Sequence, residues 1–237
     1  LLENLAEVYL SMGDSARALP VLERQREIST ELWGADDPRT ARLALPISKV
    51  EVDVHADHSK ALALLQDAVA KLEAKGQQNT RDWFEASRQM AQELSTLGKR
   101  TEALLIANKL AYGPNGRGEL ARKDPSFLGY YAEIQRMAGE TDHAAKSIED
   151  ALAMVPRTSK SLAKMSTRAR LLQSFARVEA QRNNPAKAAE LLEECLELTA
   201  KARGDENLKL IDPLIEMARL HERAKHVDKA LSATRQA

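Results

Sequence analysis

Residues 127–156 read FLGYYAEIQRMAGETDHAAKSIEDALAMVP and show how the chain is built. The segment is rich in helix-forming residues, and Gly139 interrupts it near the middle. Glycine adopts the left-handed conformation that often ends a helix, so we expect one helix before Gly139 and another after it. Ala144 follows five positions later and allows two helices to approach closely. The segment therefore predicts two antiparallel helices joined by a tight turn.

The same spacing, a turn residue followed by an alanine five positions later, recurs along the whole chain. The pairs are Gly13 and Ala18, Ala56 and Ala61, Gly98 and Ala103, Gly139 and Ala144, Asn183 and Ala188, and Lys225 and Ala230. Successive alanines are 43, 42, 41, 44 and 42 residues apart. Such a period indicates a repeat array, in which each helix pair buries its apolar face against its neighbours.

A second set of positions lies twelve residues before each of these alanines, in the first helix of each pair. It consists of Ala6, Lys49, Ala91, Ala132, Ala176 and Ala218. The second repeat departs from the pattern, because residues 43–54 (LALPISKVEVDV) alternate like a strand. We still expect a helix there, since the flanking repeats impose one. Either its register shifts by one residue or Pro46 kinks it.

These marks resemble the tetratricopeptide repeat, which has an apolar and a small residue in its first helix, a turn glycine and A-x-x-x-apolar in its second helix. Steps of 41–44 residues exceed the usual ~34 and resemble the kinesin-light-chain subclass. Residues 2–40 are similar to that subclass in their L-x-N-L-A opening, their A-L-P-x-L second helix and their L-x-G-x-D-x-P-x-T linker. The resemblance implies an all-α fold, an α-solenoid wound as a right-handed superhelix of about six helix–turn–helix units.

The repeat marks predict a single array over residues 1–237. The expected units are approximately 1–35, 38–76, 79–112, 124–156, 159–203 and 206–237. The chain opens on Leu1 rather than methionine, and the last unit stops within its second helix. We therefore expect a segment of a longer protein.

Composition argues against several classes of protein. The chain carries 35 basic and 35 acidic residues, and neither half is strongly basic, which disfavours nucleic-acid binding. No apolar run approaches the ~20 residues that span a bilayer, so we expect no membrane insertion. A single cysteine, Cys195, forms no disulfide within the chain and suits a reducing, cytoplasmic location.

Several residues invite a chemical role, and each has a simpler interpretation. His55 and His58 lie near two aspartates, but they fall at a turn and no third histidine is close enough to complete a metal site. The glycine-rich linker at residues 113–126 lacks the G-x-x-x-x-G-K-[ST] phosphate loop. Cys195 occupies a small packed position and has no adjacent base. We therefore expect no metal, no cofactor and no enzymatic activity.

The resemblance implies that first helices line a concave face and bind ligands there. The residues that flank the core pair should point into that groove: Asn4, Glu7, Arg88, Gln92, Tyr130, Glu133, Gln173, Arg177, Glu216 and Arg219. Asn4 matches the subclass asparagine that contacts a peptide backbone. Arg88, Arg177 and Arg219 are able to clamp the carboxylates of an acidic partner.

The favoured function is a scaffold or adaptor that binds a peptide or helical segment of a partner protein in this groove, within a larger complex. One alternative is a structural subunit packed inside a multiprotein assembly through its outer faces. Another is a regulatory or sensory arm of a multidomain enzyme. A reader of single-stranded RNA is a fourth hypothesis, and the balanced charge argues against it.

Overall fold

A computed structural model of the chain describes residues 2–113, 121–203 and 210–223. Every regular element among them is a helix, which confirms the all-α prediction. The chain divides into two compact units, Leu1–Gly118 and Glu119–Ala237. The predicted sixth turn and alanine, Lys225 and Ala230, lie outside the described residues.

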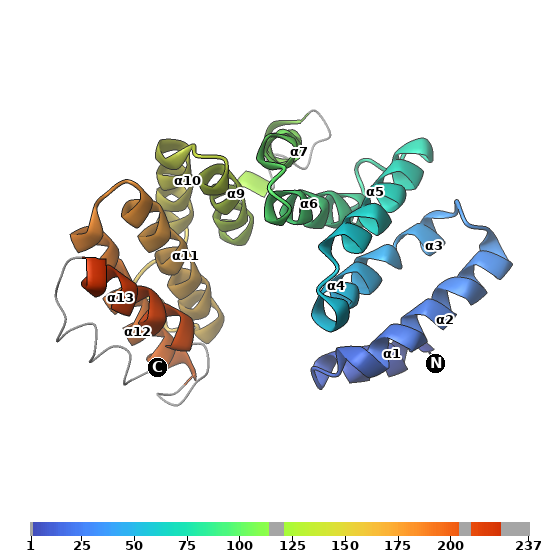
Figure 1. The fold of residues 1–237 in the computed structure, drawn as a ribbon, viewed down its shortest axis with the longest axis horizontal. Helices are drawn as coiled ribbons and strands as arrows, with labels where there is room; N and C mark the ends of the chain where they lie inside the picture. The colour runs from blue at the N-terminus through green and yellow to red at the C-terminus, as the bar shows by residue number, and fades with distance from the viewer. Residues whose placement is uncertain (1, 114–120, 204–209, 224–237) are drawn as a thin grey trace. The chain divides into compact units, whose positions relative to one another are not determined.

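Consecutive helices pack in pairs, as the repeat predicts (Figure 1). The first unit contains α1 (Leu2–Ser11), α2 (Ser15–Trp33), α3 (Pro38–Ala41), α4 (Ala44–His55), α5 (His58–Ala74), α6 (Arg81–Thr96) and α7 (Arg100–Tyr112). The second contains α9 (Pro125–Met137), α10 (Thr141–Ala153), α11 (Leu162–Gln181), α12 (Pro185–Arg203) and α13 (Ile211–Arg223). The first helices of the pairs are α1, α4, α6, α9, α11 and α13, and the second helices are α2, α5, α7, α10 and α12.

The alanines that mark the second helices lie at the centre of the packing. Their exposed fraction is 0% at every described repeat, namely Ala18, Ala61, Ala103, Ala144 and Ala188. An alanine without exposed surface marks a place where neighbouring helices approach too closely for a larger side chain. This confirms the structural meaning of the sequence period.

The second repeat is helical, and its register is shifted by one residue. Ser48 is 2% exposed and takes the place of the small core residue, whereas Lys49, which the twelve-residue spacing selects, is exposed. Ile47 and Val50 are buried beside it. The prediction of Lys49 as a core position is therefore wrong. Compared with the other repeats, the second repeat has one additional residue between its small core residue and the turn at Ala56. Pro46 lies in the first turn of α4, where a missing backbone N–H costs nothing.

The turns between paired helices follow the sequence prediction. Gly13, Gly98 and Gly139 have φ values of 73°, 79° and 90°, and Asn183 has 64°. Asp14 caps α2 by accepting a hydrogen bond from the backbone N–H of Arg17.

Thr101 and Thr141, near the starts of two second helices, do not cap them. Both residues lie inside the first turn of their helices, α7 and α10, which begin without a side-chain cap. Lys99 and Glu140 occupy the cap positions there instead.

Two buried glutamates, Glu51 and Glu179, were not anticipated from the sequence. Both are 0% exposed and lie three residues after the small core residue of a first helix. Oε1 of Glu51 accepts a hydrogen bond from Lys60 at 2.6 Å, and Oε2 lies 2.8 Å from Nδ1 of His55. Burial raises the pKa of the Glu51 carboxyl, but the hydrogen bonds outweigh burial and leave this pKa below its usual range.

Glu179 clamps the turn between α11 and α12. Its carboxylate accepts hydrogen bonds from Asn184 at 2.8 Å, from Arg182 at 2.9 Å and from Lys187 at 3.1 Å. Burial again raises the pKa of the carboxyl, and the bonds from Asn184 and Lys187 bring it below the ordinary value. Both buried carboxyls favour the charged form. Each carboxylate therefore accepts hydrogen bonds that link its first helix to the start of the following second helix.

Candidate protein-binding groove

In the second unit, three predicted groove residues lie close together on successive first helices. Glu216 of α13 accepts a hydrogen bond from Nε2 of Gln173 at 3.0 Å and one from Nε of Arg177 at 2.8 Å. Gln173 and Arg177 are one helical turn apart on α11, so both reach the same carboxylate. This arrangement brings the three side chains together, and it also means that Arg177 already has an acidic partner.

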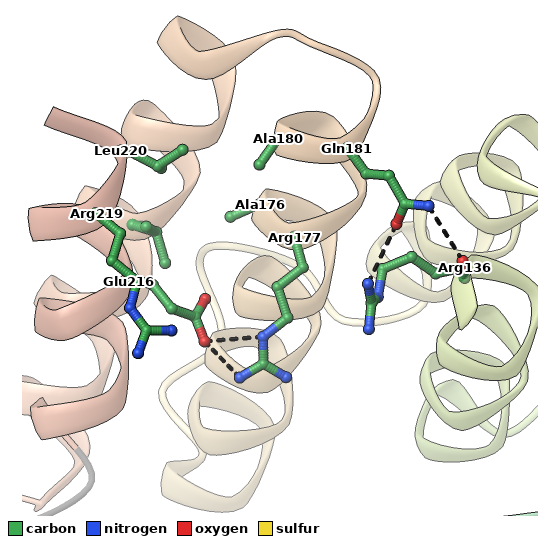
Figure 2. A pocket seen from close by; sticks show the side chains of 9 residues that line it. Arg136, Ala176, Arg177, Ala180, Gln181, Glu216, Arg219 and Leu220 are labelled. Atoms are coloured by element: carbon green, nitrogen blue, oxygen red, sulfur yellow. Dashed lines mark hydrogen bonds and ion pairs between the residues drawn. The ribbon is translucent and has the colours of Figure 1, made fainter. Parts of the chain in front are cut away.

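A cavity of about 430 Å³ lies beside this cluster (Figure 2). Its apolar lining consists of Ala176, Ala180, Leu192 and Leu220. Its polar lining consists of Arg136, Arg177, Gln181, Glu216 and Arg219. Such a volume falls within the range of small-ligand pockets, and it is large enough for a few side chains of a bound segment.

The three arginines of the cavity differ in their partners. Arg136 pairs with Glu133, with Nε and Oε2 2.9 Å apart, and this bond raises the pKa of Arg136. Arg177 pairs with Glu216, as Figure 2 shows. Arg219 makes no hydrogen bond or ion pair within the described part of the chain, and its side chain is exposed. Arg219 is therefore the guanidinium that is available for a ligand carboxylate.

Sequence reasoning missed two polar residues of the cavity, Arg136 and Gln181. They bridge α9 and α11, because Nη1 of Arg136 donates to Oε1 of Gln181 at 3.2 Å (Figure 2). Arg136 lies four residues after the core alanine Ala132, and Gln181 lies five after Ala176. The prediction considered only positions next to the core pair, so it stopped one helical turn short. Including the positions four and five residues after the core alanine of each first helix would have found both residues.

The remaining predicted residues of the second unit line no part of this cavity. Tyr130 of α9 is half-buried, and its ring centroid lies 5.9 Å from that of Phe127. Glu133 acts through its ion pair with Arg136. Neither residue therefore lines the described cavity.

The four predicted residues of the first unit are more dispersed. Asn4 and Glu7 are exposed on α1, and Gln92 is exposed on α6. Arg88 donates from Nε to Oε2 of Glu85 at 2.9 Å, one helical turn away. The described cavity of about 720 Å³ in this unit lies at the α1–α2 turn, and none of these four residues lines it.

The residues that invited a chemical role also have structural partners. His55 lies against Glu51, whereas Nδ1 of His58 is 2.7 Å from Oε2 of Glu93, so the two rings face different carboxylates. No group of three potential metal ligands occurs in the part of the chain that the structure describes. Of the linker glycines, Gly113 directly follows α7, and residues 114–120 lie outside the described ranges.

Cys195 is 2% exposed on α12. Burial raises the pKa of its thiol to about 11, which keeps the sulfur protonated at neutral pH. This supports the interpretation of Cys195 as a small core residue. Among the residues described, no helix is long and apolar enough to cross a membrane.

The geometry defines an α-helical repeat protein with a polar face built from successive first helices. Residues 1–32 match the family model of the tetratricopeptide repeat, which confirms the resemblance predicted from the sequence. The match covers the first repeat, and the other helix pairs of the described chain share their fold with solved repeat structures. No curated protein matches the sequence.

Solved structures share the fold at low sequence identity. BtubC (BKLC) from P. vanneervenii is 15% identical, with a TM-score of 0.65 over 94% of this chain and 89% of that chain. A tetratricopeptide repeat protein from Parabacteroides merdae is 15% identical, with a TM-score of 0.63 over 98% of this chain and 75% of that one. MamA from Desulfovibrio magneticus is 14% identical, with a TM-score of 0.56 over 84% and 94%. At such identities the likeness concerns the fold alone.

Proposed function

We propose that the face formed by α9, α11 and α13 binds an acidic segment of a partner protein, so that the chain acts as a scaffold or adaptor. Folds of the tetratricopeptide type generally mediate protein–protein interaction or assembly. The observation that carries the proposal is Arg219, an exposed arginine that has no partner among the described residues and lines a cavity with an apolar wall.

The chemistry of the cavity specifies the ligand. The planar guanidinium of Arg219 offers parallel N–H donors to a carboxylate. Ala176, Ala180 and Leu220 provide an apolar surface beside it. A segment with an acidic residue next to a medium-sized apolar residue satisfies both parts, whereas a purely charged segment leaves the apolar wall uncovered.

Glu216 sets the selectivity of this site. Its carboxylate lines the cavity and is paired with Arg177, which offsets part of its negative charge. The remaining negative charge repels a ligand carboxylate, so the site favours a carboxylate that reaches Arg219 from the side away from Glu216. The site therefore favours a defined spacing of acidic and apolar residues over acidity in general.

The test is a peptide library in which one acidic and one apolar position vary in spacing, with binding measured by fluorescence anisotropy. Arg219→Glu should weaken the best binder about 10- to 100-fold, the loss of a charge-assisted hydrogen bond. Lys164→Glu is the matched control, because Lys164 is exposed on α11 and lies outside the cavity. Equal losses in both variants, with unchanged helicity, would show that only overall charge matters and would reject the proposed site.

A further inference from the structure

A second cavity of about 430 Å³ lies in the second unit, between α11, α12 and α13. Its inner wall includes Ala169 of α11 and Thr199 of α12, which are 4% and 7% exposed. Arg170 of α11 and Asp212 of α13 also line it, as exposed side chains of opposite charge. This Arg170 cavity has the same volume as the cavity described above, the Arg219 cavity, so it is also large enough for a few side chains.

The two cavities follow one register along α11 and α13. Arg170 and Arg177 are seven residues apart on α11, and Asp212 and Arg219 are seven residues apart on α13. Arg170 and Asp212 line one cavity, and Arg177 and Arg219 line the other. Seven residues make about two helical turns, or about 10.5 Å at a rise of about 1.5 Å per residue. The cavities therefore follow one another along the same two helices.

The polar bridge at Glu216 lies between the two cavities. Gln173 lines the Arg170 cavity and donates a hydrogen bond to Glu216, which lines the Arg219 cavity. Arg177 bonds to the same carboxylate and lines the Arg219 cavity. A segment that fills the Arg219 cavity and continues along the two helices therefore passes this bridge and enters the Arg170 cavity.

Arg170 and Asp212 leave two unpaired charges at the Arg170 cavity. Within the residues that the structure describes, neither side chain forms a hydrogen bond or an ion pair, with the other or with any third residue. Arg168 of the same helix, by contrast, pairs with Glu194 at 2.9 Å. A bound segment can therefore offer a carboxylate to Arg170 and a basic group to Asp212 without breaking an existing ion pair.

The positions of these charges set their order in an extended segment. An extended chain advances about 3.4 Å per residue, so about 10.5 Å corresponds to about three residues. Successive side chains of such a chain point to opposite sides, so a segment between the two helices directs them alternately toward α11 and α13. With an acidic residue at Arg219 of α13, the third residue beyond it faces Arg170 of α11, and the fourth faces Asp212 of α13.

We infer that the acidic segment bound at Arg219 extends into the Arg170 cavity and carries an acidic and then a basic residue there. These residues lie three and four positions from the acidic residue at Arg219, counted toward either end of the segment. The inference rests on the proposed function and adds a charge pattern to it: acidic, two spacer residues, acidic, basic. Arg170 binds the second acidic residue, and Asp212 binds the basic one.

The probes are two peptides built on the tightest binder of the library tested against Arg219. One carries glutamate three positions and lysine four positions from the acidic residue of that binder, and the other has these two residues exchanged. Each is made with the addition on the N-terminal and on the C-terminal side. Because both peptides have the same length and net charge, a difference in affinity reports the order of the charges. In anisotropy titrations, the peptide with glutamate before lysine should bind about 3- to 10-fold more tightly, through two exposed ion pairs.

An exchange of charges in the protein tests the pairing itself. The full chain with Arg170→Glu and Asp212→Lys keeps its net charge and should prefer the exchanged peptide by a similar factor. The matched control is Lys164→Glu with Glu190→Lys, which exchanges two exposed charges outside both cavities and should keep the original preference. Circular dichroism and thermal melting check the fold of each variant, and a reversed preference is not a result that partial unfolding produces.

Equal affinity of the two peptides for the wild-type chain would overturn the inference. If Arg219→Glu still weakens both peptides in that case, the proposed function stands and only the extension into the Arg170 cavity fails. A preference that persists in the chain with Arg170→Glu and Asp212→Lys would also overturn it, because another surface would then read the order of the charges. If no peptide of the library binds, or if Arg219→Glu has no effect, the proposed function fails and the inference fails with it.

Discussion

Removal of the Glu179 carboxylate is the most direct test of how the repeats are held together. This side chain is fully buried in α11, and its two oxygens accept hydrogen bonds from Asn184, Arg182 and Lys187. Asn184 immediately precedes α12, and Lys187 lies in its first turn. Loss of the carboxylate should therefore loosen the α11–α12 pair before any other part of the chain.

The magnitude follows from the exposure of the partners. A hydrogen bond to a charged group contributes about 1.5–3 kcal/mol. Hydration of the freed partners compensates for part of this free energy, because the Lys187 and Arg182 side chains remain 46% and 32% exposed. Truncation to alanine adds a cavity at a fully buried position. We expect Glu179→Ala to lower the free energy of local unfolding by about 2–4 kcal/mol.

A second variant separates the charge from the volume. The equivalent position of the third repeat holds Leu94, which is 2% exposed, so Glu179→Leu is compatible with the packing. This variant fills the space and loses only the polar network. We expect its cost to be about 1 kcal/mol, since exposed partners recover their hydration.

Hydrogen exchange of α11 and α12 measures the effect locally. Trp33 and Trp83 are the two tryptophans of the chain, and both lie in the first unit, so tryptophan fluorescence is an internal control that should not change. Equal protection of Glu179→Leu and wild type between about pH 3 and 7 would refute a net contribution of the carboxylate.

The pH dependence has a defined sign. The folded-state pKa of Glu179 is lowered, so the carboxylate contributes its full stability above the unfolded-state pKa of about 4.3. This contribution is lost as the pH falls through the folded-state pKa. The difference between wild type and Glu179→Leu should accordingly shrink in acid.

Further predictions concern packing, the thiol and the groove. Ala144→Leu should destabilise the second unit by about 1–3 kcal/mol in urea unfolding through overpacking, whereas Ala153→Leu, at an exposed position of the same helix, should be nearly neutral. Cys195, with a pKa of about 11, should react with iodoacetamide at pH 8 only as fast as the helices open; rapid labelling of the native chain would contradict its burial. Glu216→Gln should tighten binding of the best acidic peptide several-fold, about 1 kcal/mol from removed repulsion, measured by the same anisotropy titration.

The alanine period was sufficient to predict the helix pairs, because a fully buried alanine is required at each close approach and nothing larger fits. The left-handed turns at Gly139 and Asn183 were equally predictable, since few residues adopt that conformation without strain. The same period failed at Lys49, where one additional residue before Ala56 moves the small core position to Ser48. A fixed spacing does not reveal such a local shift, because the shift depends on which side chains the neighbouring helices accept.

The groove was predictable only in part. The resemblance directed attention to the first helices, and three of the residues chosen there, Gln173, Arg177 and Glu216, contact one another. Arg136 and Gln181 were missed because they lie one turn further along their helices. The sequence also did not predict which residue pairs with each arginine. Arg177 binds a residue 39 positions away, whereas Arg219 has no partner in the described chain.

The sequence by itself determined the class of fold, the length of the repeat and the residues that turn one helix into the next. These are local properties, which depend on conformational preference and on a period that every repeat obeys. Only the tertiary structure decided which charges are neutralised and which glutamates are buried. Those outcomes depend on distances between helices of different repeats. The sequence of one helix does not specify which neighbouring helix will cover it.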